Sequence, residues 1–515
     1  MSRESYKLLL NSLHRLAIIC LCVLWVHTCL SQQTYFNNRY ELEQDWWDVT
    51  NSLVNLDTAY LIGGATVHVP TNAIKLGAIL IDSTGLEITS KTFGGGDYQF
   101  IASYNSAIIN THDGGFIYTG QVQDTSNNSA SGYLFKLGQN LDSLWFVQFD
   151  TTFLNYGAQV RQLSDSGFIV AGTDDSLGHW QFFLLRTDKL GNRIWKKKYG
   201  GAGSEGAQSI DITADGGFVV GGNSSSFGGW LDGYLIKTDS AGIFQWERSF
   251  GTPEYEGLGV VAAAANGDIL FSGIEYKYTD GQGFDYKQGY IARLSSNNDL
   301  LWKYFYGPEV TPSSGFSKLK EMDDGSIVAI GHIDEIDTLP TNNISGMILK
   351  LDANGNEVWL RKYITHDTLP SDNYFWDFDN TIDGGYIIAG HISVVTNENP
   401  LEYYQDSWLI KLDSLGCPYR GCELETGLIE LNHNLKYDEM VKVFPNPTTA
   451  KITITGYYQL PATLTIYNIN GQLVKTKKLT NRFQEVNTSG LDSGNYIYSV
   501  SSVTERVYTG NLVVK

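Results

Sequence analysis

Short apolar runs separated by turn residues recur in a fixed order along most of the chain. One copy, residues 206–251, starts with "GAQSIDIT", turns at "ADGG" and continues through "FVVGG", "GYLIKTD" and "IFQWERSFG". The runs are apolar or alternating, and Gly, Asp and Asn stand between them, which predicts four antiparallel strands joined by tight turns. The helical period of 3.6 residues is absent from these copies.

The unit occurs seven times. Its first turn falls at positions 57, 113, 165, 215, 266, 324 and 383, so successive copies lie 50 to 59 residues apart. A period near fifty with four strands per unit is typical of β-propeller blades, which stack in a ring and so cover one another's apolar faces. A β-helix has shorter rungs, and separate sandwiches need about twice as many residues per unit. The sequence therefore predicts an all-β protein with a seven-bladed β-propeller over residues 32–422.

A tryptophan recurs in the fourth run of five copies, whereas the first copy has Thr89 there. The five are Trp145, Trp195, Trp246, Trp302 and Trp359. They are either a row of ligand-stacking platforms or wedges between blades. An indole that buries ~150–250 Å² at ~25 cal/mol/Å² stabilises the fold by roughly 4–6 kcal/mol before the loss of entropy, which favours the wedge.

The seventh copy lacks a fourth run, because "SWLIKLDSLG" passes directly into "CPYRGCE". The segment "QTYFNNRY" precedes the first copy and has strand character. We expect this N-terminal segment to supply the missing strand and close the ring, since the entropy cost of loop closure grows only logarithmically with length. Deletion of residues 33–40 is then expected to destabilise the whole ring.

Residues 1–31 have the three parts of a secretory signal peptide. Arg3, Lys7 and Arg15 precede the apolar stretch "LAIICLCVLWVHTCL", and the small residue Ser31 follows it. Cys29 leaves a lipid-attached protein as an alternative, which the bulky histidine in "VHTC" disfavours. No later apolar run is long enough to cross a bilayer, so we expect an exported protein with no transmembrane segment after signal removal.

Signal removal leaves two of the five cysteines, Cys417 and Cys422 in "CPYRGC". In an oxidising compartment they are expected to form a disulfide, with two free thiols as the alternative. Metal binding is not expected here because no histidine lies nearby.

The C-terminal part of the chain follows a different pattern. A polar stretch at residues 423–440 is expected to be a linker. The alternating runs "KITITG" and "TLTIYNINGQLVK", with a hairpin turn at Asn470 and Gly471, predict a small Ig-like β-sandwich over residues 441–515.

These C-terminal strings resemble the type A C-terminal sorting domain of proteins exported by the type IX secretion system. The matching pieces are "FPNP", "IYNINGQLV", "GLDSGNYIYSV" and "NLVVK". The motif residues are Pro445, Asn446, Pro447, Gly471, Gly494 and Tyr496. The resemblance implies that the type IX machinery is a partner, that the folded protein crosses the outer membrane, and that it is secreted or held at the cell surface.

Charge excludes one class of partner. The formal net charge is −20 and the pI is near 4.8, whereas nucleic-acid-binding proteins gather basic residues into one face. The compact basic run Lys196–Lys198 is expected to solvate a strand edge. Nucleic acid is therefore not an expected partner.

Catalytic groups do not gather in the sequence. The mature histidines are scattered over different copies, and no G-x-S-x-G nucleophile motif is present. His332 and His391 follow the same run in successive copies and are expected to occupy equivalent places. Polar residues there form either a ligand surface at the blade rim or ordinary loop variation. Other mature histidines include His68, His112, His179 and His366, and the other equivalent places hold Gln121, Thr173, Asn223, Ile274 and Ala65.

The sequence gives little support to a sialidase, a quinoprotein or a calcium site. The turn spacing D-x-x-G-x-x-x-W differs from that of the sialidase Asp-box, and a quinone site cannot be located. Acidic turns such as "DANGN" can hold calcium but lack the length and bidentate carboxylate of a dedicated loop. We expect no catalytic, cofactor or metal residues, and a non-catalytic binding or structural propeller whose ligand is a glycan or a protein. The alternative is an extracellular enzyme, either a glycan-active hydrolase or a quinoprotein-like oxidoreductase.

Overall fold

The computed structural model describes most of residues 35–515, and the predicted signal peptide at 1–31 lies outside the described residues. The described residues form two compact units, one built mainly from residues 40–430 and the other mainly from residues 431–515. The gaps in the description are 44–46, 69–70, 104–105, 127–128, 229, 252–255, 280–284, 308–313, 336–342, 366–370, 396–402, 420–421, 423–427, 432–440, 445–446, 457–461, 470, 480–482 and 502–506.

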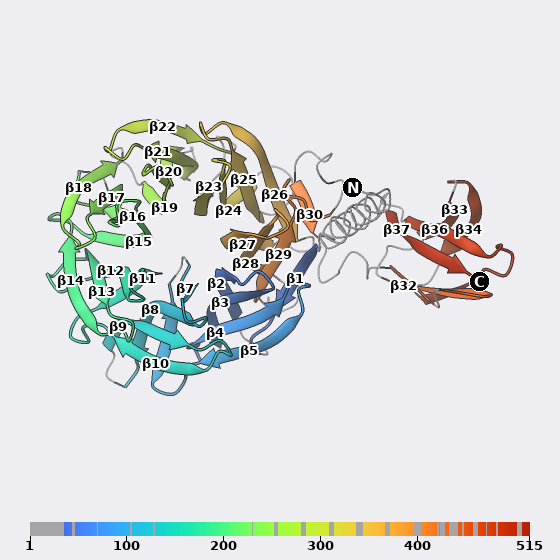
Figure 1. The fold of residues 1–515 in the computed structure, drawn as a ribbon, viewed down its shortest axis with the longest axis horizontal. Coiled ribbons are helices and arrows are strands. Elements are labelled where there is room, and N and C mark those ends of the chain that lie inside the picture. The colour runs from blue at the N-terminus through green and yellow to red at the C-terminus, as the bar shows by residue number, and fades with distance from the viewer. Residues whose placement is uncertain are drawn as a thin grey trace, which may run out of the picture. The chain divides into compact units, whose positions relative to one another are not determined.

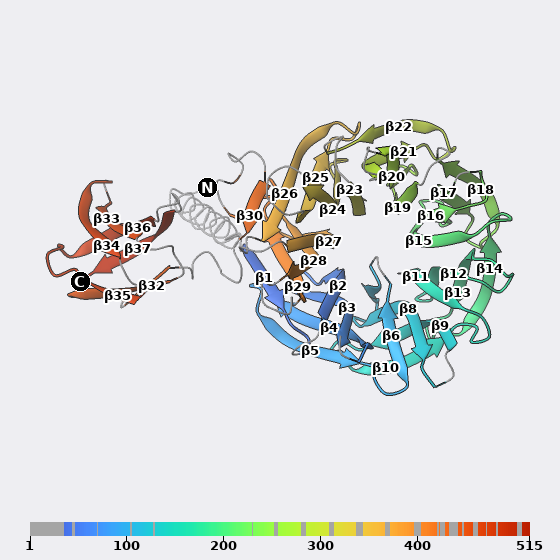
Figure 2. The same ribbon diagram turned by 180° about the vertical axis from the view of Figure 1, so that it is seen from behind.

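The first unit is a ring of antiparallel sheets, and every regular element in its described part is a strand (Figures 1 and 2). The first of four separate four-stranded sheets contains β2 (Trp47–Asn55), β3 (Ala59–His68), β4 (Ala73–Asp82) and β5 (Glu87–Phe93). Another contains β11 (Asn155–Gln162), β12 (Phe168–Asp174), β13 (Gln181–Thr187) and β14 (Arg193–Tyr199). The next contains β15 (Glu205–Ile212), β16 (Phe218–Ser224), β17 (Asp232–Thr238) and β18 (Phe244–Phe250). The last contains β19 (Gly257–Ala263), β20 (Ile269–Thr279), β21 (Asp285–Leu294) and β22 (Leu300–Phe305).

The remaining sheets of the ring depart from this plan. One has a divided inner edge, because two short strands, β6 and β7, both pair with β8. Its strands are β6 (Tyr98–Ala102), β7 (Ile108–Asn110), β8 (Phe116–Asp124), β9 (Ser129–Leu137) and β10 (Ser143–Gln148). A nine-stranded sheet holds β1 (Phe36–Tyr40), β23 (Ser314–Glu321), β24 (Ile327–Glu335), β25 (Asn343–Leu351), β26 (Glu357–Thr365), β27 (Ser371–Asn380), β28 (Tyr386–Val395), β29 (Tyr403–Leu412) and β30 (Leu428–Leu431).

The nine-stranded sheet contains the last two copies of the repeat. They are joined by a parallel bridge between Ile344 and Asp372. If the sheet is divided at that bridge, β23–β26 form one group and β27, β28, β29 and β1 form another. The all-β propeller fold is confirmed. The count of seven blades stays a prediction, because these two groups are hydrogen-bonded as one sheet.

Ring closure by the N-terminal segment is confirmed by the strand order, in which β1 follows β29. The sequence of β1 also repeats the spacing of the other outermost strands, since Phe36 stands four residues before Tyr40 as Trp302 stands before Tyr306. The Tyr40 hydroxyl donates to the carbonyl of Gly85 (2.9 Å) and that of Tyr306 to the carbonyl of Gly355 (2.6 Å). Both glycines occupy the turn before the outermost strand of a neighbouring sheet.

The recurring tryptophans lie on the outermost strands and are half-buried. Trp145 and Trp195 each pack on a core cluster formed by two adjacent sheets. A Cβ built on Gly191 would lie only 2.9 Å from the Trp145 ring, and one on Gly242 only 2.7 Å from the Trp195 ring. These glycines have φ values of +83° and +69°, so both their backbone conformation and the close approach of an indole favour glycine. The wedge role stays a prediction that this packing favours.

The structure tests three local predictions, on a disulfide, a linker and a basic run. The predicted disulfide is present, and Cys417 and Cys422 have a Cα–Cα distance of 5.5 Å. The expected linker at 423–440 contains β30, which pairs with β26.

The expectation for the Lys196–Lys198 run is wrong at Lys196, whose side chain is 5% exposed and lies 2.8 Å from Asp174 and 2.7 Å from Asp150. An ammonium paired with two carboxylates is stable in a buried site where an unpaired one would not be.

The second unit is a sandwich of a three-stranded and a four-stranded sheet. Apolar side chains from both sheets, such as Ile454 and Val500, share one core, as the alternating pattern predicts. The first sheet holds β31 (Val441–Phe444), β32 (Lys451–Gly456) and β35 (Phe483–Asn487). The second holds β33 (Ala462–Asn468), β34 (Leu473–Leu479), β36 (Gly494–Ser501) and β37 (Val507–Val514).

Candidate ligand site at the channel mouth

Most strands near the ring centre carry the same irregularity. In Figure 1 β2, β7, β11, β15, β19, β23 and β27 lie near the centre, and each of them except β7 has a register shift in its pairing with the next strand. A β-bulge of this kind re-aims one side chain and is common beside binding sites. The single extra residues in five of these strands are Asn51, Ala158, Gln208, Ser317 and Trp376.

The inner strands of the ring surround a central channel. A cavity of about 510 Å³ lies in it beside these bulges, and we call it the channel-mouth cavity. Its aromatic lining comes from Tyr156 and Trp376, and its amides come from Gln121 and Gln208. The remaining lining residues are Ile101, Ala102, Ser103, Gly120, Gly157, Ala158 and Ala207. No Asp, Glu, Lys, Arg or His belongs to this lining among the residues that the structure describes.

Trp376 is held by a stack of rings from β27 and β28. Its Nε1 donates to Nδ1 of His391 (2.9 Å), and its ring lies nearly parallel to those of Tyr374 (5.8 Å between centroids) and His391 (5.9 Å). His332 of β24 extends the cluster, with its centroid 5.1 Å from that of Tyr374. The indole is therefore fixed in one orientation by a hydrogen bond and by ring packing.

Both histidines of this cluster are neutral. Burial lowers the pKa of His332 to about 4, and burial together with the neighbouring His332 lowers the pKa of His391 to about 3. Neutral His391 has the free Nδ1 lone pair that accepts the proton of Trp376 Nε1. The Nδ1 atom of His332 is enclosed and has no hydrogen-bond partner in the described part of the chain.

Most of the places predicted to be equivalent share one register. His332 pairs with Gly315 and His391 with Tyr374, in each case just before the bulge of the inner strand. The same register holds for Ala65, Thr173, Asn223 and Ile274. Gln121 pairs with Ile101 of β6, whose pairing with β8 has no register shift. Their roles diverge. Gln121 lines the cavity, whereas Thr173 and Asn223 accept backbone N–H groups of the next sheet, from Ala207 (2.8 Å) and Leu258 (2.9 Å).

Two carboxyls with raised pKa values lie near the ring cluster. Asp334 of β24 and Asp372 of β27 are both paired with Ile344 of β25, one on each side. Burial and then the charge of Asp372 raise the pKa of Asp334 to about 6, and burial raises the pKa of Asp372. In the described part of the chain no group of three His, Cys, Asp or Glu side chains is arranged to hold a metal ion.

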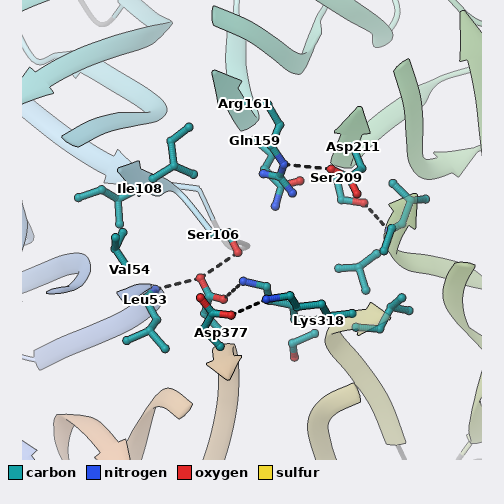
Figure 3. Close-up of a pocket in the computed structure, with 18 of the residues that line it drawn as sticks. Leu53, Val54, Ser106, Ile108, Gln159, Arg161, Ser209, Asp211, Lys318 and Asp377 are labelled. Carbon is teal, nitrogen blue, oxygen red and sulfur yellow. Dashed lines mark hydrogen bonds and ion pairs between the residues drawn. The ribbon is translucent and has the colours of Figure 1, made fainter. Parts of the chain in front are cut away.

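A second cavity, of about 460 Å³, is lined by residues that follow the bulges, so it occupies the other part of the channel (Figure 3). Its charges are paired between strands: Arg161 lies 3.4 Å from Asp211, and Lys320 lies 2.6 Å from Asp379. Asp377 pairs with Lys318 and also accepts hydrogen bonds from Leu53 N (2.9 Å) and Ser106 Oγ (2.9 Å). Because the charged side chains of this second cavity are already paired with one another, little unpaired charge is available to bind a ligand.

The sorting-motif residues belong to the sandwich. Pro445 and Asn446 lie outside the described residues, and Pro447 is exposed. Gly471 has a φ of +77° in the turn between β33 and β34, and its N–H donates to Asn468 O (3.0 Å). Gly494 begins β36, and the buried Tyr496 donates its hydroxyl to Asp492 O (2.7 Å).

The sequence interpretation missed Trp376 and Tyr374. Both stand in "NYFWDFD", where the corresponding bulge positions of other copies hold Ala158, Gln208 and Ser317. An indole at a place where sister copies hold smaller residues was the available signal. His366 lies outside the described residues, and His68, His112 and His179 line neither cavity.

Comparison with known proteins identifies the C-terminal unit. Residues 442–515 match the family described as "Secretion system C-terminal sorting domain". The domain indicates export through the type IX secretion system, interaction with that machinery, and a secreted or cell-surface location. In the described part of the chain no helix is long and apolar enough to span a membrane.

The propeller has solved structures that are similar only at the level of fold. The β-propeller domain of the trilobed protease from Pyrococcus furiosus is 8% identical, with a TM-score of 0.37 over 70% of this chain and 96% of that chain. Semaphorin 2a from Drosophila is 8% identical, with a TM-score of 0.37 over 78% of this chain and 94% of that chain. The apocarotenoid oxygenase from Synechocystis is 12% identical, with a TM-score of 0.38 over 77% of this chain and 96% of that chain. No curated protein sequence matches this chain.

Proposed function

We propose that this exported propeller is a non-catalytic binding module that holds its ligand in the channel-mouth cavity. The observation that carries the proposal is the wall of that cavity, where a fixed indole and two amides meet and where the described lining has no carboxylate, ammonium or imidazole. Convergent aromatic and amide groups give affinity and orientation, whereas hydrolysis needs an acid or a base at the reacting bond.

The test is a mixed array of oligosaccharides and peptides probed with the mature protein, residues 32–515. Retention of a probe by the wild-type protein, with weaker retention by a Trp376→Ala variant, supports binding in this cavity. Equal retention by both proteins places binding elsewhere, and no retention contradicts the binding role.

A hydrolase is the second candidate, and one observation favours it. Asp334 and Asp372 flank Ile344, and the raised pKa of Asp334, about 6, is that of a carboxyl that can exchange a proton near neutral pH. Neither carboxyl belongs to the described lining of the channel-mouth cavity. An Asp334→Asn variant separates the two functions, because binding in the cavity should survive the change and hydrolysis should not.

A further inference from the structure

We infer that the channel-mouth cavity binds a neutral oligosaccharide, with one sugar ring stacked on Trp376. This inference rests on the proposed function and names the class of its ligand.

The walls of the channel-mouth cavity favour a neutral ligand. The described lining holds amides, hydroxyls, aromatic rings, small apolar side chains and backbone, and no ionised side chain. A charged ligand would lose its hydration there without gaining a countercharge, which is costly. A neutral ligand rich in hydroxyls loses less, since each hydroxyl can exchange water for an amide or backbone partner.

The indole of Trp376 is a flat platform that suits a sugar ring. The face of an indole carries a partial negative charge, and the C–H groups on one face of a pyranose ring carry a partial positive charge, so the two faces attract. Trp376 is already fixed by His391 and Tyr374 before any ligand arrives. Binding therefore costs little side-chain entropy at this residue.

Polar groups border the same cavity as the Trp376 platform. Gln121 comes from β8 and Gln208 from β15, so amides of two different sheets border the same cavity as Trp376. The Gln121 amide is anchored through Nε2 to Asn155 O (3.3 Å). The Gln208 amide already donates to Leu258 O (3.0 Å) and accepts from Asn223 Nδ2 (2.7 Å), which holds it in place. An amide oxygen can accept a second hydrogen bond, so both amides can still accept from sugar hydroxyls. The cavity volume of about 510 Å³ is within the ~300–1,000 Å³ range of small-ligand sites.

The experiment titrates the mature protein with neutral plant and fungal oligosaccharides, with acidic oligosaccharides that carry uronic or sialic acids, and with peptides. We expect neutral oligosaccharides to bind and their affinity to fall about tenfold or more in Trp376→Ala, since ~1.4 kcal/mol of lost stacking is tenfold. Trp376→Phe keeps an aromatic face and should lose less. The matched control is Trp230→Ala, because Trp230 is 84% exposed and does not line the cavity.

Each result has one consequence. Binding of acidic oligosaccharides or peptides alone, weakened by Trp376→Ala, overturns this inference and leaves the proposed function standing. If neutral oligosaccharides bind and neither Trp376→Ala nor Trp376→Phe changes their affinity, the ligand does not bind on Trp376 and the proposed site is wrong. Absence of any binding by the wild-type protein contradicts the proposed function itself. Thermal unfolding of each variant shows whether a loss of affinity is due to misfolding. If Trp376→Ala is misfolded, the affinity of Trp376→Phe decides whether a sugar ring stacks on this side chain.

Discussion

Asp48 shows how a single buried carboxyl can set the pH response of the ring. Its side chain lies at the start of β2 and accepts the N–H of Leu42 (2.7 Å), yet its Oδ1 has no partner in the described part of the chain. Burial, and then the nearby Asp406 and Glu41, raise its pKa to about 7. The folded protein therefore keeps a proton that an unfolded Asp, with a pKa of about 3.9, releases.

The sign of the effect follows from this proton. Between pH 4 and pH 7 the folded state binds more protons than the unfolded state, so Asp48 makes the free energy of unfolding fall as pH rises. The fall is a few kcal/mol, at ~1.4 kcal/mol per pKa unit. Asp48→Asn should flatten this slope, as measured by urea unfolding at pH 5 and pH 7.5.

Asp215 provides the control for Asp48. Its burial is outweighed by hydrogen bonds from Thr213 and Lys237, which lower the pKa of Asp215 to about 2. Asp215→Asn should therefore change stability by the same amount at pH 5 and pH 7.5. An Asp48→Asn protein with the wild-type slope would contradict the assignment.

At the residue scale the sequence predicted partners that are close in the chain and missed those set by packing. The Cys417–Cys422 disulfide follows from spacing and compartment. Lys196 was expected to lie in solvent, and its burial depends on Asp174 at the end of β12 and on Asp150 between β10 and β11. Trp376 becomes a platform through the bulge in β27 and through His391, and the sequence pattern did not show where the bulge falls in the strand.

At the scale of elements, β27 is the strand that ties the ends of the ring together. Asp377 on β27 contacts Lys318 of β23, Leu53 of β2 and Ser106, which precedes β7. Its carboxylate therefore links four copies of the repeat through one side chain that is 1% exposed. A paired and hydrogen-bonded buried charge is costly to break, because its partners lose their countercharge and acceptor together.

Asp377→Ala should lower the free energy of unfolding by about 3 kcal/mol, since it leaves Lys318, Leu53 N and Ser106 without their acceptor. The matched control is Asp379→Ala, two residues along the same strand. Asp379 is 35% exposed and pairs with Lys320, which is 42% exposed, so its loss should cost less than ~1 kcal/mol. Equal losses in guanidinium unfolding of the two variants would show that Asp377 does not tie the ring.

The repeat made the elements predictable. Turn residues and alternating runs give the strands of each copy, and the missing fourth run gives the pairing of β1 with β29. The divided inner edge of β6 and β7 and the bridge between Ile344 and Asp372 were not predicted. Both arise where the chain departs from the repeat, so the repeat itself carries no information about them.

At the scale of the whole molecule, the sandwich and the propeller have separate tasks. Deletion of residues 442–515 removes the matched sorting domain and leaves the propeller strands intact. We expect the truncated protein to fold and to accumulate in the periplasm. Immunoblots of the medium, the cell surface and the periplasm measure this, with full-length protein as the control. Truncated protein outside the cell at the full-length level would contradict the export role.

The central claim is that the propeller binds a neutral oligosaccharide without converting it. The most direct measurement is calorimetric titration of the mature protein with the neutral oligosaccharide that the array retains best, followed by mass spectrometry of the recovered ligand. We expect saturable binding and a ligand of unchanged mass. Shorter products that disappear in an Asp334→Asn variant would contradict this claim and identify an enzyme.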